Sequence, residues 1–246
     1  MQENMNLLCE NFFKIRDMGY VKSLRDGPSG VGYTFETLLG KKEDHSCNPD
    51  FLGIEIKTMT ILSKQKITLF NATPDGDYAE PIKRVRDLLG YPDKQNPCFK
   101  VFQMDVKARE DTWIGYYKKM NLYINKYDKK VELFAFRKNG IPIEIQTSWS
   151  FELLQKRLET KLSYLAIVEA CKKQINGVWY YYYKRISFYK LKDFDKFLWL
   201  LKRGKIIITF KIGVERNGSN IGDIHDRGTS FSIYYKDIPY LYKRVL

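Results

Sequence analysis

The sequence predicts a mixed α/β protein. Helical and strand-like patterns alternate along the 246 residues, and no internal repeat or low-complexity linker interrupts them. The chain is 44% hydrophobic and 15% aromatic, a globular composition that can bury a substantial core. At roughly 100–200 residues per domain, the length fits one large domain or two lobes that share a cleft. A change of pattern near Ser148 divides the chain into residues 1–147 and 148–246.

The first part opens with two helical patterns and continues with strands. Apolar residues at helical spacing predict a helix over residues 6–19. A glycine-rich loop at 27–32 leads into a second amphipathic helix, for which Gly40 is a suitable stop. Residues 51–57 alternate in the manner of a strand, and residues 66–70 are expected to be its neighbour.

Further strands fill the middle of the chain, and helices alternate with strands after it. Leucines at helical spacing predict a long helix through residues 149–165. In the tyrosine-rich strand near residue 180, alternation places successive rings on opposite faces, so we expect packing rather than a stacking platform for bases. Trp149 is likewise expected to be a packing residue. The other expected elements are strands at 99–106, 113–117, 122–127, 131–136, 205–212 and 229–235 and a helix at 194–201.

The net charge indicates a polyanionic partner. The chain carries 42 Lys and Arg against 29 Asp and Glu, a formal charge of +13. Nucleic acid is the commonest such partner, because neutralising phosphates releases counterions. The basic residues are dispersed rather than gathered in a tail, which suits a concave surface that follows a phosphate backbone. A basic protein without such a partner is the alternative.

Several classes of protein are excluded. The longest apolar stretches fall far short of the ~18–20 residues that span a bilayer. The N-terminus lacks the basic start and apolar stretch of a signal peptide, so a cytoplasmic protein is expected. The cysteines and histidines are too widely spaced in the sequence for a zinc site, and the cysteines are expected to be free thiols in a reducing compartment. The residues concerned are Cys9, Cys47, Cys98, Cys171, His45 and His225.

Residues 48–57 carry the most informative chemistry. In a strand, Glu55 and Lys57 share one face, while the isoleucines beside them share the other. Asp50 precedes the strand and can fold back beside Glu55. Two carboxylates and one backbone carbonyl, that of Ile56, suit Mg²⁺, and a lysine beside the metal can orient or help deprotonate the attacking water. A surface strand with a solvated ion pair is the alternative.

Glu36, on the helix just upstream, is the next candidate. An acidic residue on a neighbouring helix can complete such a site as a further ligand to the metal or to its water. The alternative is an exposed glutamate in the first turn, favoured by the helix dipole. The glycines at 30 and 32 lack the pattern of a phosphate-binding loop.

A second group of polar residues lies at 222–229. Arg227 offers the commonest major-groove contact to guanine, Asp226 can accept from cytosine N4, and His225 can donate to guanine. A catalytic His–Asp pair or a solvated loop are the alternatives, although no nucleophile signature accompanies the pair. Further phosphate or base contacts are expected from Lys211 and Arg216.

Several of these motifs together resemble a known family. The segments 30–36, 49–58 and 67–70, followed by 149–164 and 225–229, resemble the MutH-like monomeric type II restriction endonucleases of the MvaI/BcnI group. The similarity covers most of the chain in order and is weak between about 75 and 145. It implies a PD-(D/E)xK core in a two-lobed clamp, with a catalytic lobe at 1–147 and a DNA-recognition lobe at 148–246.

The resemblance also implies roles for individual residues. Asp50, Glu55 and the carbonyl of Ile56 would hold Mg²⁺, for which Mn²⁺ is an expected substitute, Lys57 would act on the water, and Glu36 would support the metal. Such enzymes act as monomers on double-stranded DNA, cutting one strand and then rebinding in the opposite orientation. The residues expected to contact DNA are Lys211, His225, Asp226, Arg227 and Thr229.

Two departures from the family bear on the target sequence. Lys211 and Ser232 both stand where a close relative has arginine, and lysine cannot form the same planar fork. We therefore expect a different target, a G·C-rich palindrome of four or five base pairs such as GCGC. The predicted function is a Mg²⁺-dependent type II restriction endonuclease; the alternatives are a strand-nicking MutH-like repair enzyme and a non-catalytic DNA-binding protein.

Overall fold

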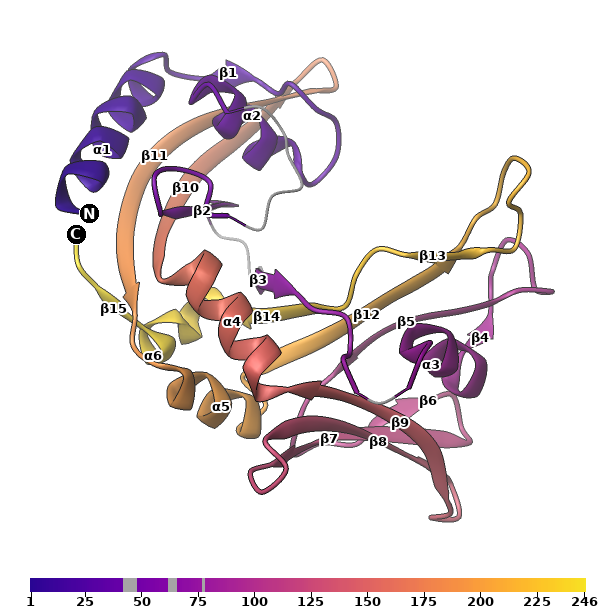
Figure 1. Cartoon of the computed structure of the whole chain (residues 1–246). Helices are drawn as coiled ribbons and strands as arrows, with labels where there is room; N and C mark the ends of the chain where they lie inside the picture. Colours follow the sequence, from indigo (N-terminus) through magenta and orange to yellow (C-terminus); the bar gives the residue numbers. More distant parts are fainter. Residues whose placement is uncertain (42–47, 62–65, 77) are drawn as a thin grey trace. The chain divides into compact units, whose positions relative to one another are not determined.

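The chain divides into two compact units, each assembled from separated segments. The computed structural model describes residues 1–41, 48–61, 66–76 and 78–246 (Figure 1). Unit 1 comprises Met1–Gln65, Leu158–Lys192 and Ile238–Leu246, and unit 2 comprises Lys66–Arg157 and Asp193–Asp237. These boundaries differ from a single division at residue 147. The assignment of catalysis and recognition to parts of the chain stays a prediction.

Unit 1 is built on one mixed sheet. Its strand order is β1-β11-β10-β2, with β15 paired to β11, and β10 and β2 are parallel while the other pairs are antiparallel. Strand β2 therefore ends the sheet. The strands are β1 (Val21–Lys22), β2 (Glu55–Thr60), β10 (Tyr164–Ile175), β11 (Val178–Leu191) and β15 (Tyr242–Arg244); the helices are α1 (Gln2–Asp17), α2 (Gly30–Leu38) and the short α6 (Ile238–Leu241).

One face of this sheet packs against α1 and α2. The apolar positions of α1 form a single cluster with α2 and with alternate residues of β10, including Ala166 and Val168. Figure 1 shows α1 lying along β11. Tyr183 is fully buried and its hydroxyl donates to the backbone oxygen of Val31 at 2.9 Å. Because one face of the sheet is covered in this way, residues of the opposite parity, including Glu55 and Lys57, lie on the other face.

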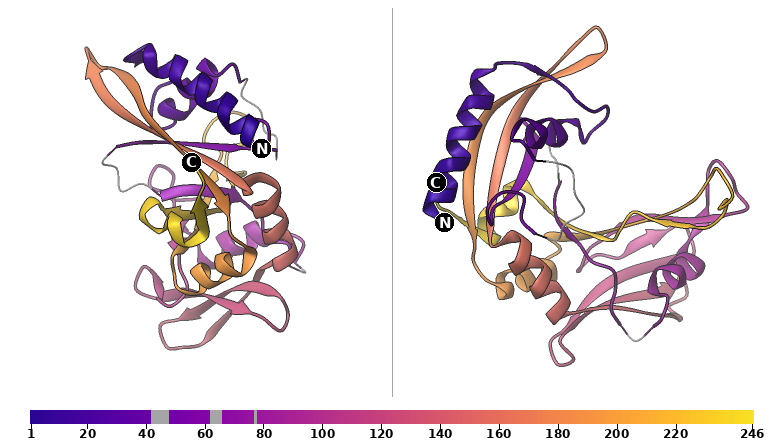
Figure 2. Two further views of the ribbon diagram at one scale, coloured as in Figure 1. Left: turned by 90° about the vertical axis from the view of Figure 1, so that its left-hand side faces the viewer. Right: turned by 45° about the horizontal axis from the view of Figure 1, so that its top comes forward.

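Unit 2 contains two antiparallel sheets. The first has the order β3-β14-β12-β5-β4 with β13 paired to β12, and the second is the meander β6-β7-β8-β9 (Figure 2). The first sheet comprises β3 (Lys66–Asn71), β4 (Tyr91–Pro92), β5 (Lys100–Val106), β12 (Ile206–Val214), β13 (Ile224–Asp226) and β14 (Ser230–Tyr234). The meander comprises β6 (Thr112–Ile114), β7 (Lys118–Asn125), β8 (Lys130–Arg137) and β9 (Pro142–Ser150), and the helices are α3 (Pro81–Leu89), α5 (Phe194–Lys202) and the 3₁₀ turn η1 (Tyr235–Asp237). Helix α4 (Phe151–Leu162) supplies residues to both units.

An aromatic group forms the centre of unit 2. Trp149 is fully buried, lies 6.1 Å from the ring of Phe210 and 5.6 Å from that of Phe231, and donates its indole N–H to the oxygen of Ala72 at 3.0 Å. The expectation that Trp149 is a packing residue is therefore confirmed. In the tyrosine-rich strand, packing is confirmed for Tyr181, which is 4% exposed, and for Tyr183, which is fully buried, whereas Tyr180 and Tyr182 on the other face are half-buried.

Three sequence-based expectations about elements were wrong. Residues 66–70 do not pair with the strand before them, because β3 pairs with β14 while β2 pairs with β10. The helix expected at 149–165 begins at Phe151 and ends at Leu162, and the leucine spacing only coincidentally continues into β10. Gly30 lies inside the first turn of α2, where an added Cβ would meet the oxygen of Arg25 at 2.5 Å. This glycine serves close packing.

No helix in the described part of the chain is both long and apolar enough to cross a membrane.

Replacing Trp149 by Ala should destabilise the protein by about 3–5 kcal/mol, because the change opens a large cavity and leaves the Ala72 oxygen without its donor. Urea unfolding followed by circular dichroism measures the loss. Trp113→Ala is the matched control: this ring is 48% exposed, so the change should cost less than about 1 kcal/mol. Equal losses for the two variants would contradict the packing described for Trp149.

Candidate functional site

A tight turn brings Asp50 back onto strand β2. Phe51 and Ile54 exchange backbone hydrogen bonds of 2.9 and 2.8 Å, and Leu52 and Gly53 between them have φ of 45° and 86°. Only glycine adopts such angles freely, so Gly53 favours this reversal. The Asp50 carboxylate then accepts the N–H of Ile56 at 2.9 Å. The prediction that Asp50 folds back onto the strand is confirmed.

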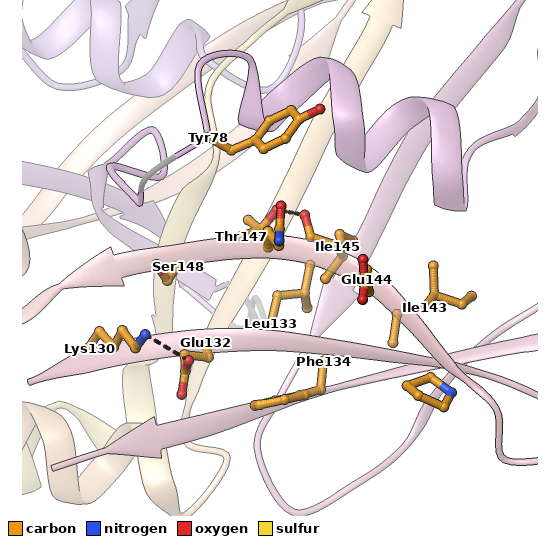
Figure 3. A pocket seen from close by; sticks show the side chains of 13 residues that line it. Tyr78, Lys130, Glu132, Leu133, Phe134, Ile143, Glu144, Ile145, Thr147 and Ser148 are labelled. Carbon is orange, nitrogen blue, oxygen red and sulfur yellow. Dashed lines mark hydrogen bonds and ion pairs between the residues drawn. The ribbon is translucent and has the colours of Figure 1, made fainter. Parts of the chain in front are cut away.

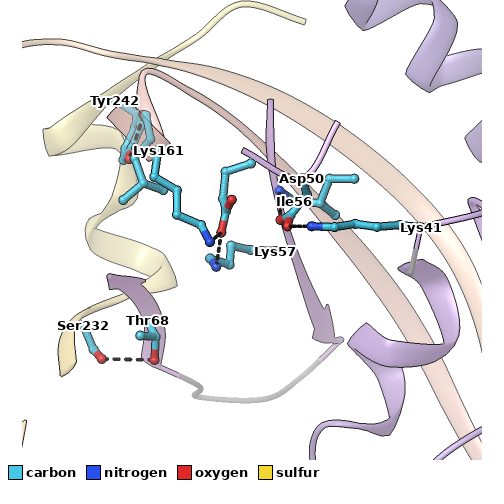
Figure 4. A network of polar contacts seen from close by, with 10 residues as sticks. Lys41, Asp50, Ile56, Lys57, Thr68, Lys161, Ser232 and Tyr242 are labelled. Atoms are coloured by element: carbon cyan, nitrogen blue, oxygen red, sulfur yellow. Dashed lines mark hydrogen bonds and ion pairs between the residues drawn. The ribbon is translucent and has the colours of Figure 1, made fainter. Parts of the chain in front are cut away.

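Glu55 is a buried carboxylate with one unsatisfied oxygen. Its side chain is 1% exposed, and Oε1 accepts from Lys57 Nζ at 2.5 Å and lies 3.5 Å from Lys161 Nζ (Figure 4). Oε2 is buried and has no hydrogen-bond partner within the described residues. Burial raises the pKa of Glu55, and the charge of Asp50 adds to the rise, although Lys57 and Lys161 oppose it. Such a carboxylate is set up to receive a cation.

Asp50 has the opposite electrostatic character. Burial by itself would raise its pKa, but the hydrogen bonds from Lys41 and from the Ile56 N–H and the charge of Lys57 outweigh burial and lower it. Figure 4 shows Lys41 reaching Asp50 while Lys57 and Lys161 point to the neighbouring carboxylate. The two acidic groups therefore stand side by side in environments that shift their pKa values apart.

Three lysines of the described residues lie at this site, and sequence reasoning missed two of them. Lys161 lies in the last turn of α4, more than a hundred residues after Glu55, and Lys41 lies three residues after the end of α2. No local spacing links either one to the E-x-K pattern. The contact of Lys161 depends on the parallel pairing of Leu165 with Glu55, which only the tertiary structure reveals.

The residues present fit a divalent cation with several waters. Asp50 and Glu55 provide neighbouring carboxylate oxygens, and the unpartnered Oε2 of Glu55 leaves a buried acceptor to be satisfied. Within the described part of the chain, no three His, Cys, Asp or Glu side chains are grouped closely enough to hold a metal by themselves. Mg²⁺ suits such a site, because it binds through one or two carboxylates and keeps much of its water. Ile56 would supply the carbonyl.

Glu36 lies on α2, beside β2. A Cβ built on Gly32 would be 3.1 Å from Thr58 Oγ1 and 3.8 Å from Glu36 Oε1, so both side chains approach this glycine. The side chains of Thr58 and Glu55 lie on opposite faces of β2. Glu36 is thus near the helix-covered face of β2, and its support of the metal site stays a prediction.

The second group of predicted residues lies on the first sheet of unit 2. Along β12, half-buried Thr209, Lys211 and Gly213 alternate with fully buried residues. His225 is opposite Gly213 in the register, and the N–H of Arg227 donates to the oxygen of Lys211 at 3.3 Å. The structure therefore brings Lys211, His225 and Arg227 together, although their contact with DNA stays a prediction.

Glu215 holds the ring of His225 through Nδ1. A carboxylate can only accept, so Nδ1 carries a proton, and Nε2 can donate to a base only when the ring is protonated. Asp226 accepts the N–H of Gly228 at 2.9 Å, and burial raises its pKa despite this bond.

Two other residues predicted to contact DNA have contacts within the protein. Thr229 is fully buried, its backbone oxygen accepts from the N–H of Ala72, and its Oγ1 has no hydrogen-bond partner within the described residues, so its contact with DNA stays a prediction. Arg216 forms a two-bond pair with Asp93, at 2.8 and 3.1 Å, so its guanidinium already has a carboxylate partner within the protein. Sequence patterns do not reveal these partners because they are distant along the chain.

An acidic residue missed by the sequence completes the polar face. Asp105 on β5 accepts from Lys66 at 2.5 Å and from Thr209 at 2.6 Å. Burial lowers the pKa of Lys211, and the charge of Lys66 adds to this, while Asp105 and Asp226 oppose it.

A hollow of about 410 Å³ lies elsewhere in unit 2, over β8 and β9 near Tyr78 (Figure 3). Its charged groups include Lys130 and Glu132, which pair with each other at 3.1 Å. It holds none of the predicted site residues, and we assign it no role.

Comparison with known proteins identifies similar molecules. The sequence model of the MvaI/BcnI restriction endonuclease family matches residues 9–242. A solved structure described as restriction endonuclease MvaI in complex with its cognate DNA substrate is similar over 100% of this chain and 98% of that chain, with 30% identity and a TM-score of 0.91. A structure of MvaI in the absence of DNA matches with the same coverage, 25% identity and a TM-score of 0.65. No curated protein matches.

Asp105→Asn should reduce stability near neutral pH and have little effect in acid. Burial works to raise the pKa of Asp105, but hydrogen bonds from Lys66 and Thr209 lower it overall. A lowered acidic pKa stabilises the fold above the unfolded value, about 3.9, and this stabilisation is lost as the pH falls through the folded value. Melting temperatures from pH 3 to 7 test this. Asp26→Asn, at an exposed position, is the control, and a pH-independent difference for Asp105→Asn would refute the assignment.

Proposed function

Because the chain belongs to the MvaI/BcnI restriction endonuclease family and is therefore a site-specific nuclease that acts on DNA, we propose that it is a Mg²⁺-dependent type II enzyme. It hydrolyses phosphodiester bonds in double-stranded DNA at a short, G·C-rich palindrome of four or five base pairs. One observation carries the catalytic part of this proposal. Glu55 is buried beside Asp50 and Lys57 with an oxygen that has no partner in the described residues.

Contacts of the side chains support the proposed roles of Asp50, Glu55 and Lys57, while the role of Glu36 rests on the family resemblance alone. Asp50 and Glu55, with the carbonyl of Ile56, would hold the metal, and Glu36 would support it. When bound, Mg²⁺ would supply positive charge that stabilises the negative charge of the phosphate, and it would lower the pKa of a water molecule. Lys57, already in contact with Glu55, orients or helps deprotonate the attacking water, and Lys161 adds a second ammonium that can face the phosphate's charge. Burial of Glu55 strengthens each of these interactions.

DNA binding is assigned to the basic surface and to the polar sheet face of unit 2. The charge of +13 favours phosphates, and the similar MvaI structure contains its cognate DNA. Lys211, His225, Asp226 and Arg227 would read base edges. We further propose that the protein acts in the cytoplasm as a monomer. A monomer carries one catalytic site, so the two DNA strands are cut in successive events.

Replacing Lys57 by Ala should reduce cleavage by about 10²–10⁴-fold, the range for loss of a proton-transferring group. Binding should change by only a few-fold, because phosphate contacts elsewhere remain. Plasmid cleavage and metal-free gel shifts measure the two effects separately. Lys14→Ala, at an exposed position on α1, is the control. Cleavage retained by Lys57→Ala would remove this residue from the mechanism.

Chelation of divalent ions should abolish cleavage, and Mg²⁺ or Mn²⁺ should restore it. Asp50→Asn should raise the Mg²⁺ concentration needed for half-maximal cleavage, because it removes one anionic ligand. A non-catalytic DNA-binding protein would instead bind DNA in a salt-sensitive way with no cleavage under any metal condition.

Cleavage of a supercoiled plasmid with one target site should pass through a transient open circle before the linear product forms. A monomer must dissociate or turn between the two cuts, so the nicked form should accumulate and then decay. Time courses on agarose gels show both phases. Persistent open circles without linear DNA would favour the strand-nicking repair alternative.

A further inference from the structure

Gln103 lies on the polar face that carries the predicted base-reading residues. On β5 it is exposed, while the adjacent Phe102 is fully buried. In the antiparallel pairing of β5 with β12, Gln103 is directly opposite Lys211. Directly opposite residues share a face of the sheet and lie about 5 Å apart, so their side chains project together. On the other side of Lys211, its backbone oxygen accepts the N–H of Arg227.

The side chain of Gln103 is available to a ligand. Its backbone is engaged, since the oxygen accepts from the hydroxyl of Tyr91 at 3.2 Å and the N–H donates to that hydroxyl at 3.3 Å. The side-chain amide has no hydrogen-bond partner within the described part of the chain. The neighbouring acidic residue, Asp105, is by contrast occupied by Lys66 and Thr209. Gln103 thus has a fixed backbone and an unused amide.

The amide of Gln103 lies close to Gly213, which has no side chain. A Cβ built on Gly213 would have only two neighbours within 4 Å, the backbone oxygen of His225 at 3.5 Å and Nε2 of Gln103 at 3.9 Å. The amide therefore reaches toward the space above Gly213. On β12, Gly213 follows Lys211 by two residues, and it is opposite His225 on β13. Gln103 Nε2 is thus the one side-chain atom among the neighbours of this Cβ position within the described residues, and no other side chain there competes with a ligand for the amide.

The chemistry of the amide differs from that of its neighbours. Lys211 and Arg227 offer only donors, which suit the O6 and N7 acceptors of guanine. The amide of Gln103 offers a donor and an acceptor together, which match the N7 acceptor and N6 donor of adenine. We propose that Gln103 reads an adenine in the major groove, so that the target contains at least one A·T pair among the G·C pairs. This inference rests on the proposed function and replaces a target of G·C pairs alone.

The target is first determined by sequencing the ends of phage DNA digested by the wild-type enzyme with Mg²⁺. Duplex oligonucleotides then carry each of the four base pairs at every position. Metal-free competition gel shifts measure the relative affinity, so the result does not depend on catalysis. The wild type should prefer A·T at one position by about 5- to 150-fold, the range of a good bidentate contact.

Gln103→Ala should reduce the preference at that position to within about threefold and leave every other position unchanged. Gln103→Glu should favour C·G there, because a carboxylate can only accept, as from cytosine N4. Gln146→Ala, which replaces another exposed glutamine of unit 2, is the control and should keep the wild-type preferences. Melting temperatures confirm that the variants are folded.

Two results would overturn the proposal: a target without any A·T pair, or an unchanged base preference in Gln103→Ala. In either case discrete cleavage by the wild type would leave the proposed function standing. Failure of the wild type to produce discrete fragments with Mg²⁺ or Mn²⁺ would instead refute the proposed function.

Discussion

The candidate catalytic site depends on the burial of one carboxylate. Glu55 is at the beginning of an edge strand, 1% exposed, with two lysines near one oxygen and no partner, within the described residues, for the other. An anion in such a place is costly unless cations surround it. Lys57 and Lys161 provide that compensation, and a bound divalent cation would complete it. The turn that returns Asp50 to the same strand keeps the second carboxylate beside it.

The two carboxylates of the candidate site are opposite in sign to the net charge of the whole molecule. A protein with a charge of +13 attracts DNA at long range, while Asp50 and Glu55 form a small acidic group that repels phosphate. Lysines at 41, 57 and 161 offset the repulsion. In the proposed function, the excess positive charge accounts for DNA binding, and the compensated carboxylates would set the position of the cleavage chemistry.

The polar face of unit 2 follows from strand alternation of the same kind. Strand β12 buries Ile208, Phe210 and Ile212 on one side, which leaves Thr209, Lys211 and Gly213 on the other. Neighbouring strands then place side chains of different hydrogen-bonding character beside them. Internal pairs fix some of these groups, as Glu215 fixes His225, and leave others available. Selectivity on such a face depends on which groups the protein has not already used.

The sequence by itself determined what depends on neighbours in the chain. The spacing of Asp50, Glu55 and Lys57, the helix around Phe12 and the alternating tyrosines were all predictable, because dihedral preferences and periodicity act within a few residues. The tertiary structure alone decided that β2 pairs with β10 and that β3 belongs to another sheet. It also brought Lys161 to Glu55 and Gln103 to Lys211, and it buried Thr229. Long-range strand pairing sets these contacts, and many alternative pairings satisfy the same local pattern of apolar and polar residues.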